Sequence, residues 1–140
     1  MSFNFEIPKI FKSIHLSDYA PEFGEEAVIE VWVNFPRALL IERNTILAGV
    51  EKNDKELEEV RKENPPDQER IDVLQKESID LQDQFNDWLA KVWHQKGTPI
   101  SKEEITAMFE QADITDPKLM EWLFVRTFAL ILEHREARKN

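Results

Sequence analysis

Cysteine is absent from the 140-residue sequence, and glycine is scarce, with three residues. Without cysteine the chain has no disulfide bonds, no thiolate catalysis and no zinc–thiolate sites, which fits a reducing compartment. Three glycines are too few for the many turns of an all-β sandwich or for a glycine-rich loop that holds phosphate groups. Disulfide-stabilised, thiol-dependent and P-loop proteins are therefore excluded.

Positive charge is in the minority, with 18 Lys and Arg residues against 28 Asp and Glu residues and a net charge of −10. Nucleic-acid affinity comes largely from cationic side chains, so we expect no nucleic-acid partner. The most apolar window, Leu119 to Leu132, contains Glu121 and Arg126 and is too short to span a bilayer. The N-terminus has no basic region followed by an apolar run, so we expect no signal peptide and no membrane partner. The sequence predicts a soluble, cytoplasmic protein.

The residues that usually carry chemistry are scattered. His15, His94 and His134 lie in unrelated segments, and no H-x-x-x-H pair suggests a metal site. Ser101 is explained by a helix-capping role rather than by nucleophilic chemistry. The acidic stretch 51–63 is interspersed with lysine and arginine at helical pairing distances, which favours a solvated helix face over a calcium loop. We therefore expect no catalytic, cofactor-binding or metal-binding residues, and no enzyme activity.

Hydrophobic residues make up 41% of the chain, which is ample for a core, and 140 residues are most simply one domain. We predict a single domain over residues 1–140 of the α+β class, mainly α. Its expected segments are a β-hairpin region (1–35), a long antiparallel αα-hairpin (36–96) and a C-terminal helical pair (100–140).

The strongest periodic pattern lies in residues 71–92, where apolar side chains recur at alternating spacings of three and four. Only Ser78 is polar among the seam positions, which are Ile71, Leu74, Ser78, Leu81, Phe85, Trp88 and Val92. Four further residues fall outside the seam and are expected to widen the apolar face, namely Val73, Ile79, Leu89 and Trp93. The seam is either the core of this domain or a surface that also pairs with another copy or a partner.

A looser version of the same period precedes the seam, and Arg43 and Asn53 interrupt it. The prolines of the segment 64–67 (NPPD) should stop the first helix near Glu63, and Asp67 or Asn64 can cap the second. Two helices joined by a short turn pack antiparallel, so we predict an αα-hairpin over residues 37–95. Gly97 is expected to form its left-handed C-terminal cap.

The N-terminal part reads as a β-hairpin of residues 10–17 and 27–34, with residues 3–7 as a further edge strand. In the C-terminal part, Ser101 and Glu104 form a capping box that opens a helix over about 102–112. Asp116 and Pro117 then open the last helix. This helix is apolar nearly all round, which indicates burial on more than one side.

Five large aromatic residues exceed what one narrow helical seam needs. They are either core residues or anchors of a protein interface, because Trp and Phe carry much of the energy at protein contacts. These interface candidates are Trp88, Trp93, Trp122, Phe124 and Phe128.

Taken together, the chain is similar to the tail assembly chaperones of long-tailed bacteriophages. Residues 16–23 (LSDYAPEF) and 29–37 (IEVWVNFPR) resemble the short β-hairpin of that family and its asparagine–proline helix start. Residues 93–105 (WHQKGTPISKEEI) resemble the family's W…G-x-P…E-x-I segment, and residues 119–123 (LMEWL) resemble its closing helix. The long charged hairpin over residues 40–80 departs from the family pattern.

The resemblance implies a non-catalytic assembly factor in the cytoplasm of a bacterial host. Such proteins bind the helical tape measure protein and keep it soluble until tail tube protein polymerises around it. Many are made in two lengths by a ribosomal frameshift, and this chain would be the shorter product. The resemblance also allows a homo-oligomer, and it assigns no binding residue.

The sequence also allows two other classes of function. The first is a structural or adaptor protein of a virion or other assembly that dimerises through its helical hairpin. The second is an acidic inhibitor that mimics nucleic acid, which is weaker because lysines and arginines interrupt the acidic runs.

Overall fold

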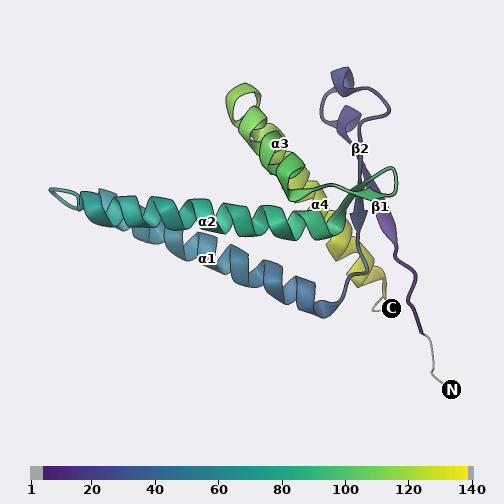
Figure 1. The fold of residues 1–140 in the computed structure, drawn as a ribbon, viewed down its shortest axis with the longest axis horizontal. Coiled ribbons are helices and arrows are strands. Elements are labelled where there is room, and N and C mark those ends of the chain that lie inside the picture. Colours follow the sequence, from purple (N-terminus) through teal and green to yellow (C-terminus); the bar gives the residue numbers. More distant parts are fainter. Residues whose placement is uncertain (1–4, 139–140) are drawn as a thin grey trace. The chain divides into compact units, whose positions relative to one another are not determined.

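The computed structural model describes residues 5–138 and has the mainly helical α+β fold that the sequence predicts (Figure 1). Short 3-10 turns at Leu16–Asp18 and Pro21–Phe23 join the first two strands. The strands are β1 (Phe11–His15), β2 (Val28–Trp32), β3 (Trp93–Gln95) and β4 (Thr98–Pro99). The helices are α1 (Arg37–Arg61), α2 (Gln68–Val92), α3 (Lys102–Thr115) and α4 (Pro117–Arg138).

The chain groups into two compact units. One is the αα-hairpin, residues 36–89, and the other combines residues 5–35 with residues 90–138. Helix α2 begins in the first unit and ends in the second. The single domain expected over residues 1–140 stays a prediction.

The strands form one antiparallel sheet in the order β1-β2-β3-β4. Ile14 of β1 lies opposite Ile29 of β2, and both side chains are buried. The predicted hairpin of residues 10–17 and 27–34 is confirmed. The expected edge strand over 3–7 is not: residues 5–7 form no strand, and residues 3 and 4 lie outside the described residues. Pro8, which lacks an amide donor, follows that segment directly.

The predicted end of the αα-hairpin was wrong. Helix α2 ends at Val92, and the next residues form β3, where Trp93 pairs with Val31 of β2. Gly97 is left-handed, with φ of 78°, but it sits in the turn between β3 and β4 and does not cap a helix. Its amide donates to Glu30 Oε1 at 2.9 Å. The edge of β2 offers backbone hydrogen-bond donors and acceptors to Trp93 and His94. These residues can pair with that edge only in an extended conformation, so helix α2 does not continue.

Helix α4 packs against β1 and β2 of the sheet and against α3. Four residues on its sheet side are buried, namely Met120, Leu123, Thr127 and Ile131. The Trp93 indole Nε1 donates to Thr127 Oγ1 at 3.1 Å, and that hydroxyl donates to the Leu123 carbonyl at 2.7 Å. A buried indole N–H therefore has a partner inside this core.

The two C-terminal helices begin where the sequence predicts. The capping box of Ser101 and Glu104 is present, with the Glu104 amide donating to Ser101 Oγ at 3.1 Å. Helix α3 continues to Thr115, beyond the predicted end near 112. Asp116 follows as its C-cap, and the Asp116 amide donates to the Ala112 carbonyl at 2.8 Å. A single residue, Asp116, thus separates α3 from α4.

In the hairpin unit, α1 and α2 run antiparallel (Figure 1). Asp67 caps α2, because its Oδ1 accepts the Arg70 amide at 3.1 Å. The seam is buried or half-buried, and the Trp88 indole Nε1 donates to the Leu39 carbonyl of α1 at 2.8 Å. Of the four residues expected to widen the apolar face, Leu89 and Trp93 are fully buried, whereas Val73 and Ile79 are 48% and 70% exposed.

Candidate functional site

The five interface candidates fall into two groups. Trp88 and Trp93 are fully buried, so neither side chain presents a surface to a partner in this conformation. Trp122, Phe124 and Phe128 are half-buried, and all three lie on α4. The interface role of the five residues stays a prediction, and the half-buried group on α4 is the part of it that solvent can reach.

Helix α4 carries a second apolar seam on the side opposite its buried residues. Its members are spaced by three, four and three residues, and none is charged: Trp122, Val125, Ala129 and Leu132. Val125 and Leu132 are 61% and 59% exposed, while Trp122 and Ala129 are half-buried. We call these four residues the α4 outer face. Exposed apolar side chains at this spacing are typical of a surface that receives another helix.

Aromatic contacts hold both flanks of the α4 outer face. The Trp122 ring lies 5.3 Å from the ring of Tyr19, and the Phe124 ring lies 5.2 Å from the ring of Phe109 on α3. Offset or tilted ring pairs of this kind stabilise by about 0.5–1.5 kcal/mol beyond their area. Trp122 therefore keeps a defined position at the edge of the face.

Tyr19 also ties the loop after β1 to the junction of α3 and α4. Its hydroxyl donates to Asp116 Oδ2 at 2.6 Å. This hydrogen bond, together with burial and the negative charge of Asp116, raises the pKa of Tyr19 above its ordinary value of 10.0. Because the hydrogen bond needs the protonated hydroxyl, it contributes stability below pH 10.0 that is lost as the pH rises through the raised pKa.

Tyr19 is the one tyrosine of the sequence, so its ionisation can be followed by tyrosinate absorbance without interference. We expect a midpoint above 10.0 in the folded protein and a shift back toward 10.0 in Asp116→Asn, which removes the charge and the strong acceptor. Asp113→Asn, three residues earlier on α3, is the control and should leave the midpoint of the wild type unchanged. Equal midpoints in wild type and Asp116→Asn would contradict the assignment.

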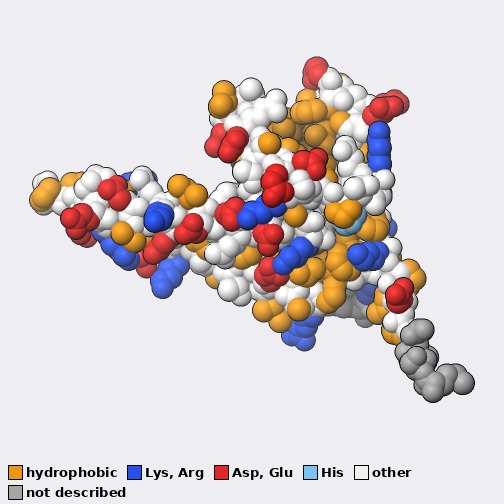
Figure 2. All heavy atoms as spheres, viewed as in Figure 1, with side chains coloured by type: hydrophobic (Ala, Val, Ile, Leu, Met, Phe, Trp, Pro, Cys, Tyr) orange, Lys and Arg blue, Asp and Glu red, His pale blue; other side chains and the backbone are white. Residues whose placement is uncertain are grey.

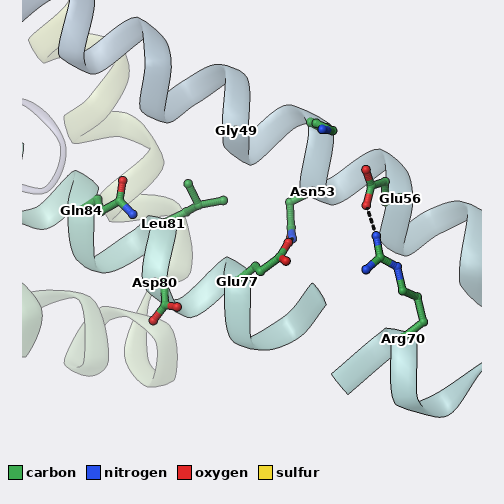
Figure 3. A pocket seen from close by; sticks show the side chains of 9 residues that line it. Gly49, Asn53, Glu56, Arg70, Glu77, Asp80, Leu81 and Gln84 are labelled. Carbon is green, nitrogen blue, oxygen red and sulfur yellow. Dashed lines mark hydrogen bonds and ion pairs between the residues drawn. The ribbon is translucent and has the colours of Figure 1, made fainter. Parts of the chain in front are cut away.

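The hairpin unit holds an open hollow of about 430 Å³ between α1 and α2. Asn53 of α1 and Glu77 of α2 point toward one another across it, and Arg70 reaches Glu56 at 2.7 Å (Figure 3). Leu81 lines the same hollow, and its Cδ2 would lie 3.0 Å from a Cβ on Gly49, so a larger residue there would require a small shift of the Leu81 side chain. Along the rest of the hairpin, acidic and basic side chains are interspersed (Figure 2).

Neither feature is evident from the sequence, for identifiable reasons. Asn53 interrupts the apolar period, and a polar residue at a seam position is itself a signal of a special buried site. The 3-4-3 spacing of the α4 outer face is visible in the sequence. A helix that is apolar nearly all round, however, has several lines of apolar residues with this spacing. Only the packing of the sheet against one side shows which line is exposed.

Within residues 5–138, no group of three or more His, Asp or Glu side chains is placed to hold a metal ion. None of the helices in the same range is long and apolar enough to cross a membrane. Comparisons with protein-family models, with curated proteins and with solved structures find no match.

Proposed function

We propose that this protein is a phage tail assembly chaperone that binds the tape measure protein and keeps it soluble during tail assembly, without catalysis. The observation that supports the proposal is the α4 outer face. A tape measure protein is a long helical client, and an apolar seam with 3-4-3 spacing suits the side of another helix. Many copies bound along one client would add their weak contacts, and tail tube protein would later displace them.

The net charge of −10 supports the same proposal. A chaperone that covers an apolar client must leave the complex soluble, and excess negative charge opposes association between coated complexes. In the proposed mechanism, the apolar α4 outer face contacts the client, and the charged residues elsewhere on the protein keep the complex soluble.

The test is co-expression with the tape measure protein encoded in the same genome. We expect the wild type to raise the soluble fraction of that protein and the double variant Val125→Asp/Leu132→Asp to lose the effect. Both side chains are already exposed, so the double variant should change the free energy of unfolding by about 1 kcal/mol or less. Circular dichroism during urea unfolding checks this.

The control is Ile79→Asp, which adds one such negative charge at a site that is 70% exposed on α2. It should solubilise the client as the wild type does. A wild type without effect on solubility contradicts the proposal, and a control that fails as badly as the double variant contradicts the role of the α4 outer face.

The alternative is a structural or adaptor protein that dimerises through its helical hairpin. The exposed apolar residues of α2, Val73 and Ile79, are six positions apart, which places them about 120° apart around the helix. They form no continuous stripe, so a hairpin dimer is the second choice. Light scattering over a range of concentrations separates the two: a fixed dimer that Ile79→Asp dissociates favours the alternative.

A further inference from the structure

Strand β1 is an edge of the sheet, and its outer side has no partner strand within residues 5–138. The Val33 amide donates to the Ile10 carbonyl at 3.0 Å. The Leu16 amide donates to the Ala27 carbonyl at the same distance, so the even-numbered residues along this strand bond to β2. In an antiparallel pair the residues between them direct their amides and carbonyls away from β2. The backbone groups that a further strand can reach belong to Phe11, Ser13 and His15.

The segment that precedes β1 leads away from the sheet and carries two exposed apolar side chains (Figure 1). Phe5 and Ile7 are 69% and 68% exposed, and the exposed Glu6 lies between them. This alternation is typical of a strand with one covered side, although residues 5–7 form no strand in the single chain. Covering the two apolar side chains would be favourable, so the segment is suited to another surface.

This segment is held in a position from which it does not reach β1 of its own chain. The Pro8 carbonyl accepts a hydrogen bond from Asn34 Nδ2 at 2.9 Å, and the Ile10 amide donates to Asn34 Oδ1 at 2.8 Å. Both groups face the end of β2, so residues 8–10 continue the extended line of β1. A hairpin turn at these residues would break both hydrogen bonds. The strand that pairs with β1 therefore comes from another molecule.

A second copy of the chain fits the free edge in an antiparallel register about a twofold axis at Lys9. In this register Ile7 of one copy lies opposite Phe11 of the other, and Phe5 lies opposite Ser13. These are hydrogen-bonded pairs, because the odd-numbered residues of both segments direct their backbone groups toward the shared edge. The exposed Phe5 and Ile7 side chains then lie on the same side of the sheet as the half-buried Phe11.

Two residues near the axis are compatible with this register. Pro8 falls opposite Ile10 at a position without a hydrogen bond across the edge, so its missing amide donor costs nothing there. Lys9 falls opposite Lys9 of the second copy. Its ammonium group lies over the ring of Trp32 in its own chain, 4.4 Å from the centroid, which holds the charge toward β2 and away from the axis.

The charges favour the same register. Glu6 of one copy lies opposite Lys12 of the other, and within residues 5–138 neither side chain has an ion pair. Burial and the positive charges of Arg138 and Lys12 lower the pKa of His134, so Lys12 lies beside a basic group at the end of α4. A carboxylate that approaches Lys12 across the edge is therefore attracted by several cations.

We propose that two copies of this chain associate through β1, each placing residues 5–7 as a strand beside β1 of the other. The two sheets join into one, and the strand-like pattern of residues 5–7 acquires its partner between copies. Glu6 pairs with Lys12 at two places related by the twofold axis.

The first experiment measures self-association of the full chain by analytical ultracentrifugation from micromolar to millimolar concentration. We expect a monomer–dimer equilibrium for the wild type. Glu6→Lys and Lys12→Glu each place two like-charge pairs in the dimer, so either variant alone should dimerise about tenfold more weakly. An equimolar mixture of the two should recover dimerisation, because every pair in the mixed dimer then joins a lysine to a glutamate.

The control is Glu22→Lys, which makes the same change of charge as Glu6→Lys at an exposed site in the turn after β1. It should dimerise as the wild type does. A wild type that stays monomeric, a mixture that associates no better than its components, or a dimer that Ile79→Asp dissociates and Glu6→Lys does not would each overturn the proposal.

Cysteine substitutions test the register, because the sequence contains no cysteine. A mixture of Phe5→Cys and Ser13→Cys should form a mixed disulfide under mild oxidation, since the Cα atoms of a hydrogen-bonded antiparallel pair lie about 5.5 Å apart, as in a disulfide. Ile7→Cys mixed with Ser13→Cys is out of register and should cross-link much more slowly. Equal cross-linking of the two mixtures on non-reducing gels would contradict the register.

The β1 edge and the α4 outer face consist of different residues. The double variant Val125→Asp/Leu132→Asp should therefore dimerise as the wild type does. Failure of this dimer and failure of the proposed function are distinguishable, because one is read from self-association and the other from the solubility of the client.

Discussion

Replacing Trp93 by alanine is expected to lower the free energy of unfolding by about 4 kcal/mol, because the change empties a fully buried site. It also removes the indole N–H that donates to Thr127 Oγ1 at 3.1 Å. That hydroxyl still donates to the Leu123 carbonyl, so most of the loss comes from the cavity. Urea unfolding followed by circular dichroism measures the change.

The matched control is Trp122→Ala. Trp122 is half-buried, so its removal should cost about 1–2 kcal/mol and leave the fold intact. In the co-expression test, Trp122→Ala should solubilise the client less well, because it removes an anchor of the α4 outer face. Equal losses of stability in the two variants would show that Trp122 belongs to the core and not to an accessible surface.

Replacing Asn34 by alanine is expected to lower the free energy of unfolding by about 2 kcal/mol through the loss of three hydrogen bonds. Asn34 Oδ1 accepts the Ile10 amide and the Trp32 indole Nε1, both at 2.8 Å, and its Nδ2 donates to the Pro8 carbonyl at 2.9 Å. Through these hydrogen bonds, the Asn34 side chain connects the segment before β1 to the end of β2. Hydrogen exchange at the Ile10 amide should become much faster in the variant.

Asn34→Asp distinguishes the acceptor from the donor. The aspartate keeps both acceptor bonds but turns a carboxylate oxygen toward the Pro8 carbonyl, so we expect about half of the alanine loss. Asn44→Ala, at an exposed site on α1, is the control and should change stability by about 0.5 kcal/mol or less. Unchanged exchange at Ile10 in Asn34→Ala would contradict the fastening role.

The elements that carry their own local signals were predictable from the sequence. Ser101 and Glu104 place the start of α3, because a capping box needs only neighbouring residues. The seam from Ile71 to Trp88 places the buried side of α2, since its period matches one face of a helix. The prolines after α1 mark the hairpin turn for the same reason.

Features that depend on remote partners were not predictable. Residues 93–95 carry a helical pattern, yet they form β3 because the edge of β2 offers them backbone hydrogen bonds. Gly97 has the left-handed backbone that the sequence predicts, but it lies in the turn between β3 and β4 and not at the end of a helix. The polar position of Asn53 interrupted a pattern in the sequence, and only the opposite helix gives its side chain partners.

The sequence by itself determined the class of fold, the helix starts and the acidic character of this protein, because periodicity, caps and charge are properties of neighbouring residues. Only the tertiary structure decided where α2 gives way to β3, which apolar line of α4 is exposed and that Asn53 lies buried beside a hollow. Burial and hydrogen bonding at these places depend on segments far away in the chain, and a single stretch of sequence carries no record of which segments those are.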